Sequence, residues 1–126
     1  MMITREELLK IGYLIKKIRE NNAACNINLK YKILKLEGFL KEEFEITNML
    51  LQDLSFKYAE TNEAGEPVIE NGAIKIIAEK ALQLQAELNE FCKTNIQVPE
   101  YYFTLDELDT LSLDWNEIEA FMPFIK

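Results

Sequence analysis

Apolar residues recur at steps of three and four positions near the N-terminus, which is the period of an amphipathic helix. The stripe is formed by Leu8, Ile11, Ile15 and Ile18. Thr4 and Glu7 stand at the spacing of a capping box, so the helix is expected to begin at about Arg5. Asn21 and Asn22 then interrupt the pattern, and the first helix is expected to end before them.

A longer helical pattern follows. It begins at Asn26 or Asn28, either of which can cap it, and reaches about Tyr58 without a proline. An unbroken helix of about 30 residues would be roughly 45 Å long, and its first half is expected to pack antiparallel on the first helix. Gly38 marks the expected bend or close contact, because glycine inside a helix costs up to about 1 kcal/mol relative to alanine.

Asn71-Gly72 is the clearest turn signal in the chain. Both residues accept the positive φ of a type I′ turn, and two short β-prone runs, residues 67–70 and 73–76, flank them. A two-stranded hairpin alone is marginal in water, so a third strand is expected beside it, with residues 96–98 as the candidate.

Three more helices are predicted after the hairpin. The first covers residues 78–93. Its expected apolar face consists of Ala81, Leu82, Leu84, Leu88, Phe91 and Cys92. Two short helices should follow, because Thr104 with Glu107 and Asp114 with Glu117 repeat the capping-box spacing.

These elements predict an α+β fold that is mostly α, in a single domain. Its parts are a long N-terminal helical hairpin (residues 4–59), a small central β-hairpin (residues 66–77) and a C-terminal part with short helices (residues 78–126). The composition agrees with a folded chain, since 48% of the 126 residues are hydrophobic.

No targeting or membrane segment is expected. No stretch approaches the roughly 18 to 20 apolar residues that cross a bilayer, and residues 1–20 are charged and amphipathic rather than signal-like. Cys25 and Cys92 lack a metal-type spacing and are expected to be reduced.

The chain has no histidine, which excludes Ser–His and Cys–His nucleophilic pairs, HExxH zinc sites and mixed Cys/His zinc clusters. Paired carboxylates, lysine chemistry and all-oxygen metal sites remain, and none has a recognisable spacing here. We therefore expect no enzymatic activity, no cofactor and no metal.

Charge is sorted along the chain. Residues 8–41 carry eight basic and two acidic residues, whereas residues 42–126 carry five basic and eighteen acidic ones, and the net charge of the chain is −8. The expected hairpin tip gathers a basic cluster, which consists of Lys16, Lys17, Arg19, Lys30, Lys32 and Lys35. The readings of this cluster are a solvated face, a site for an acidic protein partner, or a nucleic-acid contact. The last is disfavoured by the single arginine and by the net charge.

The acidic C-terminal part also has alternative readings. Asp106 and Glu107 suit the first turn of a helix, where the dipole favours negative charge, better than a calcium loop. The acidic surface could also imitate nucleic acid and block a DNA-binding protein. Trp115, Phe121 and Phe124 are either core residues or an apolar docking surface for a partner.

Two segments resemble a family of uncharacterised small proteins of bacteriophages and prophages. They are residues 57–76, which include Asn71-Gly72, and residues 111–125, which end in Phe121-Met122-Pro123-Phe124-Ile125. The resemblance implies a phage gene product located in the host cytoplasm or in the virion, and it carries over no catalytic residue.

The resulting expectation is a non-enzymatic protein–protein interaction protein of a phage, a structural or assembly component of the virion. A homo-oligomer is among the expected assemblies. The alternative is an acidic inhibitor or decoy that acts on a host defence or DNA-binding protein.

Overall fold

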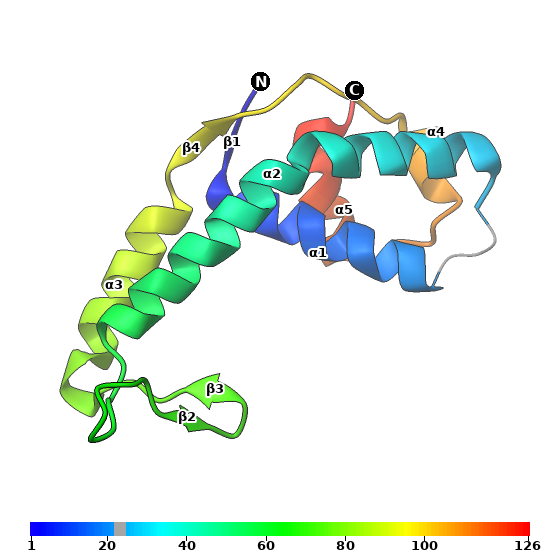
Figure 1. The fold of residues 1–126 in the computed structure, drawn as a ribbon. Coiled ribbons are helices and arrows are strands. Elements are labelled where there is room, and N and C mark those ends of the chain that lie inside the picture. The colour runs from blue at the N-terminus through cyan, green and yellow to red at the C-terminus, as the bar shows by residue number, and fades with distance from the viewer. Residues whose placement is uncertain (22–24) are drawn as a thin grey trace. The chain divides into compact units, whose positions relative to one another are not determined.

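The computed structural model describes residues 1–21 and 25–126 and has an α+β fold that is mostly α, as predicted (Figure 1). The first helix includes Asn21, so the interruption predicted at that residue is wrong, and the one predicted at Asn22 lies outside the described residues. The chain divides into two compact units: unit 1 contains residues 1–44 and 95–126, and unit 2 contains residues 45–94. The expectation of a single domain stays a prediction.

Helix α1 (Arg5–Asn21) begins at the predicted residue because its capping box forms. The Thr4 hydroxyl accepts a hydrogen bond from the backbone N–H of Glu7 (3.1 Å), and the Glu7 carboxylate accepts one from the backbone N–H of Thr4 (2.9 Å). All four residues of the predicted apolar stripe are buried, together with Leu14.

Helix α2 (Ile27–Lys57) runs for 31 residues and is capped by Asn26, whose side chain accepts a hydrogen bond from the backbone N–H of Leu29 (2.9 Å). The helix continues through Gly38. The close contact expected there is wrong, because beyond its own turns of the helix no heavy atom of the described residues lies within 4 Å of a Cβ added at Gly38.

The N-terminal half of α2 packs antiparallel on α1 within unit 1, as predicted (Figure 1). Arg19, near the end of α1, pairs with Glu37 (2.7 Å), and Arg5, at its start, approaches Glu43 (3.9 Å). The end of α1 thus contacts an earlier residue of α2 than the start of α1 does, as expected for antiparallel helices.

The predicted third strand forms but joins a different partner. Strand β4 (Asn95–Gln97) pairs antiparallel with β1 (Met2–Thr4), with Ile3 opposite Ile96. Both isoleucines are buried in the core of unit 1, and this burial selects the pairing over one with the β-hairpin.

The β-hairpin consists of β2 (Ile69–Glu70) and β3 (Ala73–Ile74) in unit 2. Asn71 and Gly72 have φ of 53° and 78°, as a type I′ turn requires. The segment just after α2 lies beside the hairpin in place of residues 96–98. There the backbone N–H of Glu60 donates to the Lys75 carbonyl (2.8 Å), and the N–H of Val68 donates to the Glu60 carbonyl (2.8 Å).

A short 3₁₀ helix, η1 (Ala78–Lys80), leads into α3 (Ala81–Cys92). The predicted apolar face of α3 is only partly correct. Leu84 is buried, whereas Ala81 is exposed and Leu82 is 87% exposed. Among the described residues, the buried hydrophobic cluster consists of unit 1 side chains alone, and Leu84 is outside it.

Both predicted short helices form. They are α4 (Leu105–Asp109) and α5 (Trp115–Phe121), and each has a complete capping box. A second 3₁₀ helix, η2 (Met122–Phe124), follows α5. In the part of the chain that the structure describes, no helix combines the length and apolar character needed to span a membrane.

Candidate interaction site

The predicted C-terminal docking residues separate into two groups. Phe121 and Phe124 are completely buried, and the Phe121 ring packs edge-to-face on Phe103 with centroids 5.4 Å apart. They form core rather than surface, so their assignment to a docking surface is wrong. Trp115 is 91% exposed and is the one predicted docking residue that a partner could contact.

Helix α5 holds Trp115 in place because its N-terminus is fixed by two reciprocal hydrogen bonds. The Asp114 carboxylate accepts from the backbone N–H of Glu117 (2.8 Å), and the Glu117 carboxylate accepts from the N–H of Asp114 (3.1 Å). Trp115 is the first residue of this helix. Burial of Ala120 and Phe121 on the core side turns Trp115 outward.

Trp115 belongs to a larger apolar surface. Ile118 and Met122 follow it at steps of three and four on the same helical face, and they are 40% and 62% exposed. Leu105 of α4, 65% exposed, lines a hollow together with Ile118. We call Leu105, Trp115, Ile118 and Met122 the α5 patch. Sequence reasoning missed Leu105 and Ile118, although the spacing of Trp115, Ile118 and Met122 carried the signal.

The hollow in the α5 patch has a volume of about 220 Å³. Its lining consists of Leu105, Leu108, Asp109, Ser112, Leu113 and Ile118. It is smaller than the roughly 300–1,000 Å³ that small-molecule sites occupy. Its size and mostly apolar lining therefore suit a side chain of a partner protein.

Exposed carboxylates accompany the α5 patch on both of its helices. Asp106 and Asp109 lie on α4, Asp114 caps α5, and Glu119 lies between Ile118 and Ala120. None of the four forms an ion pair with a described residue, so their charges are available to a cationic partner.

The basic cluster is less concentrated than its sequence suggests. Lys17 pairs with Glu117 (3.2 Å), Arg19 with Glu37 (2.7 Å) and Lys32 with Glu107 (2.9 Å). The carboxylates of Glu107 and Glu117 come from α4 and α5. The charges that are sorted along the sequence are therefore mixed in space within unit 1, because carboxylates of α4 and α5 pair with lysines of α2 and α1.

Lys16, Lys30 and Lys35 are the remaining members of the basic cluster. All three are exposed and form no ion pair among the described residues. The Lys35 ammonium lies 5.7 Å from the centre of the Phe39 ring. Half of the basic cluster is thus still available to a partner.

Lys32 has the largest number of described contacts among the residues of the basic cluster. Its ammonium donates to the backbone carbonyl of Tyr102 (2.7 Å) and to Glu107 (2.9 Å), and it lies 4.8 Å from the centre of the Phe103 ring. Burial raises the pKa of Glu107, but hydrogen bonds from the Thr104 backbone and from Lys32 outweigh it, and the pKa lies below its usual value.

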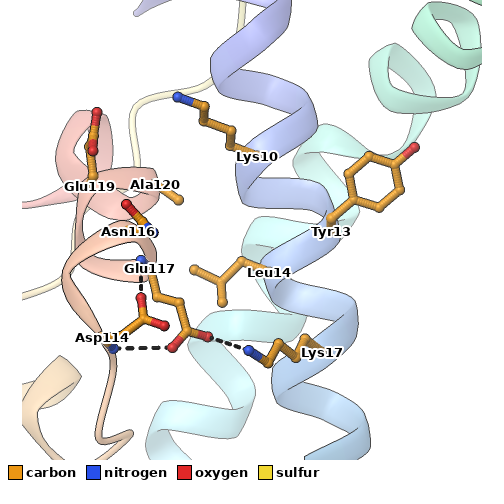
Figure 2. Close-up of a pocket in the computed structure, with 9 residues that line it drawn as sticks. All are labelled: Lys10, Tyr13, Leu14, Lys17, Asp114, Asn116, Glu117, Glu119 and Ala120. Carbon is orange, nitrogen blue, oxygen red and sulfur yellow. Dashed lines mark hydrogen bonds and ion pairs between the residues drawn. The ribbon is translucent and has the colours of Figure 1, made fainter.

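A second, larger hollow of about 420 Å³ lies between α1 and α5 (Figure 2). Lys10, Tyr13 and Lys17 line it from α1, and Asn116 and Glu119 line it from α5. The ion pair between Lys17 and Glu117 crosses its edge, as the dashed lines show. Two of the charged residues that line this hollow, Lys17 and Glu117, therefore neutralise each other.

The residues that sequence reasoning did not single out include a polar cluster in unit 2. The Tyr58 hydroxyl donates to Glu87 (2.7 Å), and the Lys57 ammonium lies 3.4 Å from the same carboxylate oxygen. The hydrogen bond from Tyr58 lowers the pKa of Glu87, and the same bond raises the pKa of Tyr58. The cluster joins the end of α2 to α3.

In residues 1–21 and 25–126, no group of three or more Cys, Asp and Glu side chains is placed to bind a metal ion. Cys25 is buried, Cys92 is half-buried, and the two are not joined in a disulfide. Comparisons with protein-family models, with curated proteins and with solved structures give no match to this chain.

Proposed function

We propose that this protein is a non-enzymatic interaction protein of a bacteriophage or prophage that serves as a structural or assembly component of the virion. The observation that carries the proposal is the α5 patch. Trp115 is 91% exposed at the start of a firmly capped helix, and Ile118 of the same helix lines a mostly apolar hollow of about 220 Å³. Tryptophan is enriched among the residues that dominate binding at protein interfaces.

The biological setting of the proposal comes from the sequence resemblance. Residues 57–76 and 111–125 resemble small phage and prophage proteins, and the second segment includes the α5 patch residues Trp115, Ile118 and Met122. The host cytoplasm and the virion are the locations that this setting implies.

Purified particles of the phage that carries the gene provide the test. The protein is expected to co-purify with the particles, and Trp115→Asp is expected to reduce its incorporation. Aspartate suits the first turn of a helix, so this change should leave α5 intact. Leu82→Asp on α3, at a residue that is 87% exposed, is the matched control and should be incorporated normally. Particles that lack the wild-type protein would contradict the proposal.

The alternative, an acidic decoy for a host DNA-binding protein, has weaker support. Glu107 and Glu117 are paired with Lys32 and Lys17, so lysines interrupt the acidic surface of α4 and α5 at these two residues. A nucleic-acid mimic needs a continuous negative surface. The decoy would gain support if reversal of several exposed carboxylates to lysine abolished binding to a host nuclease.

A further inference from the structure

Helix α2 carries a second exposed apolar surface, on its N-terminal half in unit 1. Ile27, Tyr31 and Leu34 are 79%, 61% and 51% exposed. They follow one another at steps of four and three, on the side of the helix opposite to the buried Leu29 and Leu36. We call Ile27, Tyr31 and Leu34 the α2 stripe.

The charge beside the α2 stripe is positive. Lys30, Lys35 and Lys41 are exposed and form no ion pair with a residue that the structure describes, and they outnumber the exposed Glu42 of the same stretch. The α5 patch has the opposite sign, because its exposed neighbours Asp109 and Glu119 are acidic. The two apolar surfaces of one chain are therefore complementary in charge.

Gly38 extends the α2 stripe by one more turn, four residues after Leu34. It is exposed, and beyond its own turns of the helix no heavy atom of the described residues lies within 4 Å of the position that a Cβ would take. No intramolecular contact therefore requires glycine at this point of a long helix. Glycine does permit a second backbone to approach closely, which is the use that a docked partner would make of it.

We infer that the α2 stripe of one copy docks on the α5 patch of a second copy. This inference rests on the proposed function for the use of the α5 patch and names its occupant. Trp115 contacts the apolar residues of the stripe, and the unpaired lysines of α2 face the unpaired carboxylates of α4 and α5. The carboxylates beside the α5 patch of a second copy complement the lysines beside the α2 stripe, and each copy of the chain carries both surfaces.

The contact is heterologous, because it joins two different surfaces. Repetition of a heterologous contact produces a closed ring or an open filament, the two forms of assembly that repeat one contact without a two-fold axis. A stripe on one helix and a patch on another should bury no more than about 1,200 Å², the upper limit of weak interfaces. The assembly is therefore expected to depend on protein concentration and to weaken with added salt.

Sedimentation of two variants, alone and mixed, tests the inference. Leu34→Glu removes the α2 stripe and Trp115→Asp removes the α5 patch. The self-association of each variant alone should be at least about tenfold weaker than that of the wild type, since loss of a central anchor has an effect of that size. Mixed in equal amounts, they should form a one-to-one dimer, because each retains the surface that the other lacks. A mixture without a dimer, or variants that assemble like the wild type, would overturn the inference.

Gly38→Ala provides a second measurement. It should weaken the association several-fold while the thermal midpoint of the dilute protein does not fall, because alanine favours the helix. Leu82→Asp is the control that should assemble normally. Circular dichroism of each variant verifies that the total helix content is unchanged.

The outcomes also separate the two proposals. A wild-type protein that stays monomeric at high concentration but enters particles through Trp115 would overturn the inference and support the proposed function. One-to-one dimers of the mixed variants, together with particles that lack the protein, would support the inference and contradict the proposed function.

Discussion

The ring of Phe44 lies against the backbone of Gly12, so close that a Cβ at residue 12 would overlap the ring. Gly12 belongs to α1 and Phe44 to α2, and the neighbouring Tyr13 ring meets Phe44 edge-to-face with centroids 5.3 Å apart. The approach of the two helices within unit 1 therefore depends on the absence of a side chain at one position.

Gly12→Ala and Gly38→Ala form a matched pair of predictions. The first should lower the free energy of unfolding by about 1–3 kcal/mol, because the Phe44 ring must leave its site. The second should raise it by up to about 1 kcal/mol, because it meets no atom and gains helix propensity. Chemical denaturation of the dilute proteins measures both. Equal effects of the two changes would contradict the close approach at Gly12.

Lys32→Met should destabilise the protein by about 1–2 kcal/mol. The change leaves the Tyr102 carbonyl without the hydrogen bond from the ammonium and removes the ion pair with Glu107. Lys30→Met is the control, and it should change the stability by no more than about 0.5 kcal/mol because Lys30 is exposed and forms no ion pair with the described residues. Urea unfolding compares the two, and equal losses would contradict the structural role of Lys32.

Glu87 should make the free energy of unfolding depend on pH under acidic conditions, and the size of this dependence should be set by Tyr58. The hydrogen bond from Tyr58 is the largest cause of the lowered pKa of Glu87. A lowered folded-state pKa stabilises the fold above the unfolded-state value of about 4.3, and this contribution disappears as the pH falls through the folded-state pKa. Tyr58→Phe should therefore raise the pKa of Glu87 and flatten the pH dependence of unfolding below about pH 4.3.

Carboxyl NMR titration of Glu87 measures that pKa directly. Lys57→Met is the comparison and should raise it less, since the attraction of Lys57 is a smaller cause than the Tyr58 hydrogen bond. An unchanged Glu87 pKa in Tyr58→Phe would contradict the hydrogen bond.

Truncation of Trp115 and of Phe121 should affect stability to very different extents. Trp115→Ala should change the stability of the dilute protein by no more than about 0.5 kcal/mol, because the side chain is 91% exposed. Phe121→Ala should cost about 3–5 kcal/mol, because it empties a fully buried site beside Phe103.

Fluorescence gives a direct readout, because Trp115 is the only tryptophan of the chain. Its emission in the dilute protein should resemble that of indole in water and be quenched readily by acrylamide. A blue-shifted emission that resists quenching would contradict its exposure.

Much of the local structure could be predicted from the sequence. The caps at Thr4, Thr104 and Asp114 and the turn at Asn71 and Gly72 form where expected, because each depends on side chains within a few residues of the backbone groups that they satisfy. Pairings between distant segments were harder. The strand at residues 95–97 was anticipated, but its partner was not.

The candidate site could also be predicted only in part from the sequence. The exposed Trp115 and the buried Phe121 are both aromatic residues of one short helix, and composition does not distinguish them. Their exposure depends on which face of α5 the core covers. The separated charge of the sequence is likewise changed by folding, since Glu107 and Glu117 reach Lys32 and Lys17 across the chain.

The sequence by itself determined the helices, their caps, the β-hairpin turn and the opposite charges of the two parts of the chain, because these follow from local periodicity and from counting. Only the tertiary structure decided that β1 pairs with β4, that the Phe44 ring packs on Gly12, and that Trp115 is exposed while Phe121 and Phe124 are buried. Those outcomes depend on which residues far apart in the chain exclude water together, and that is a property of the packed core.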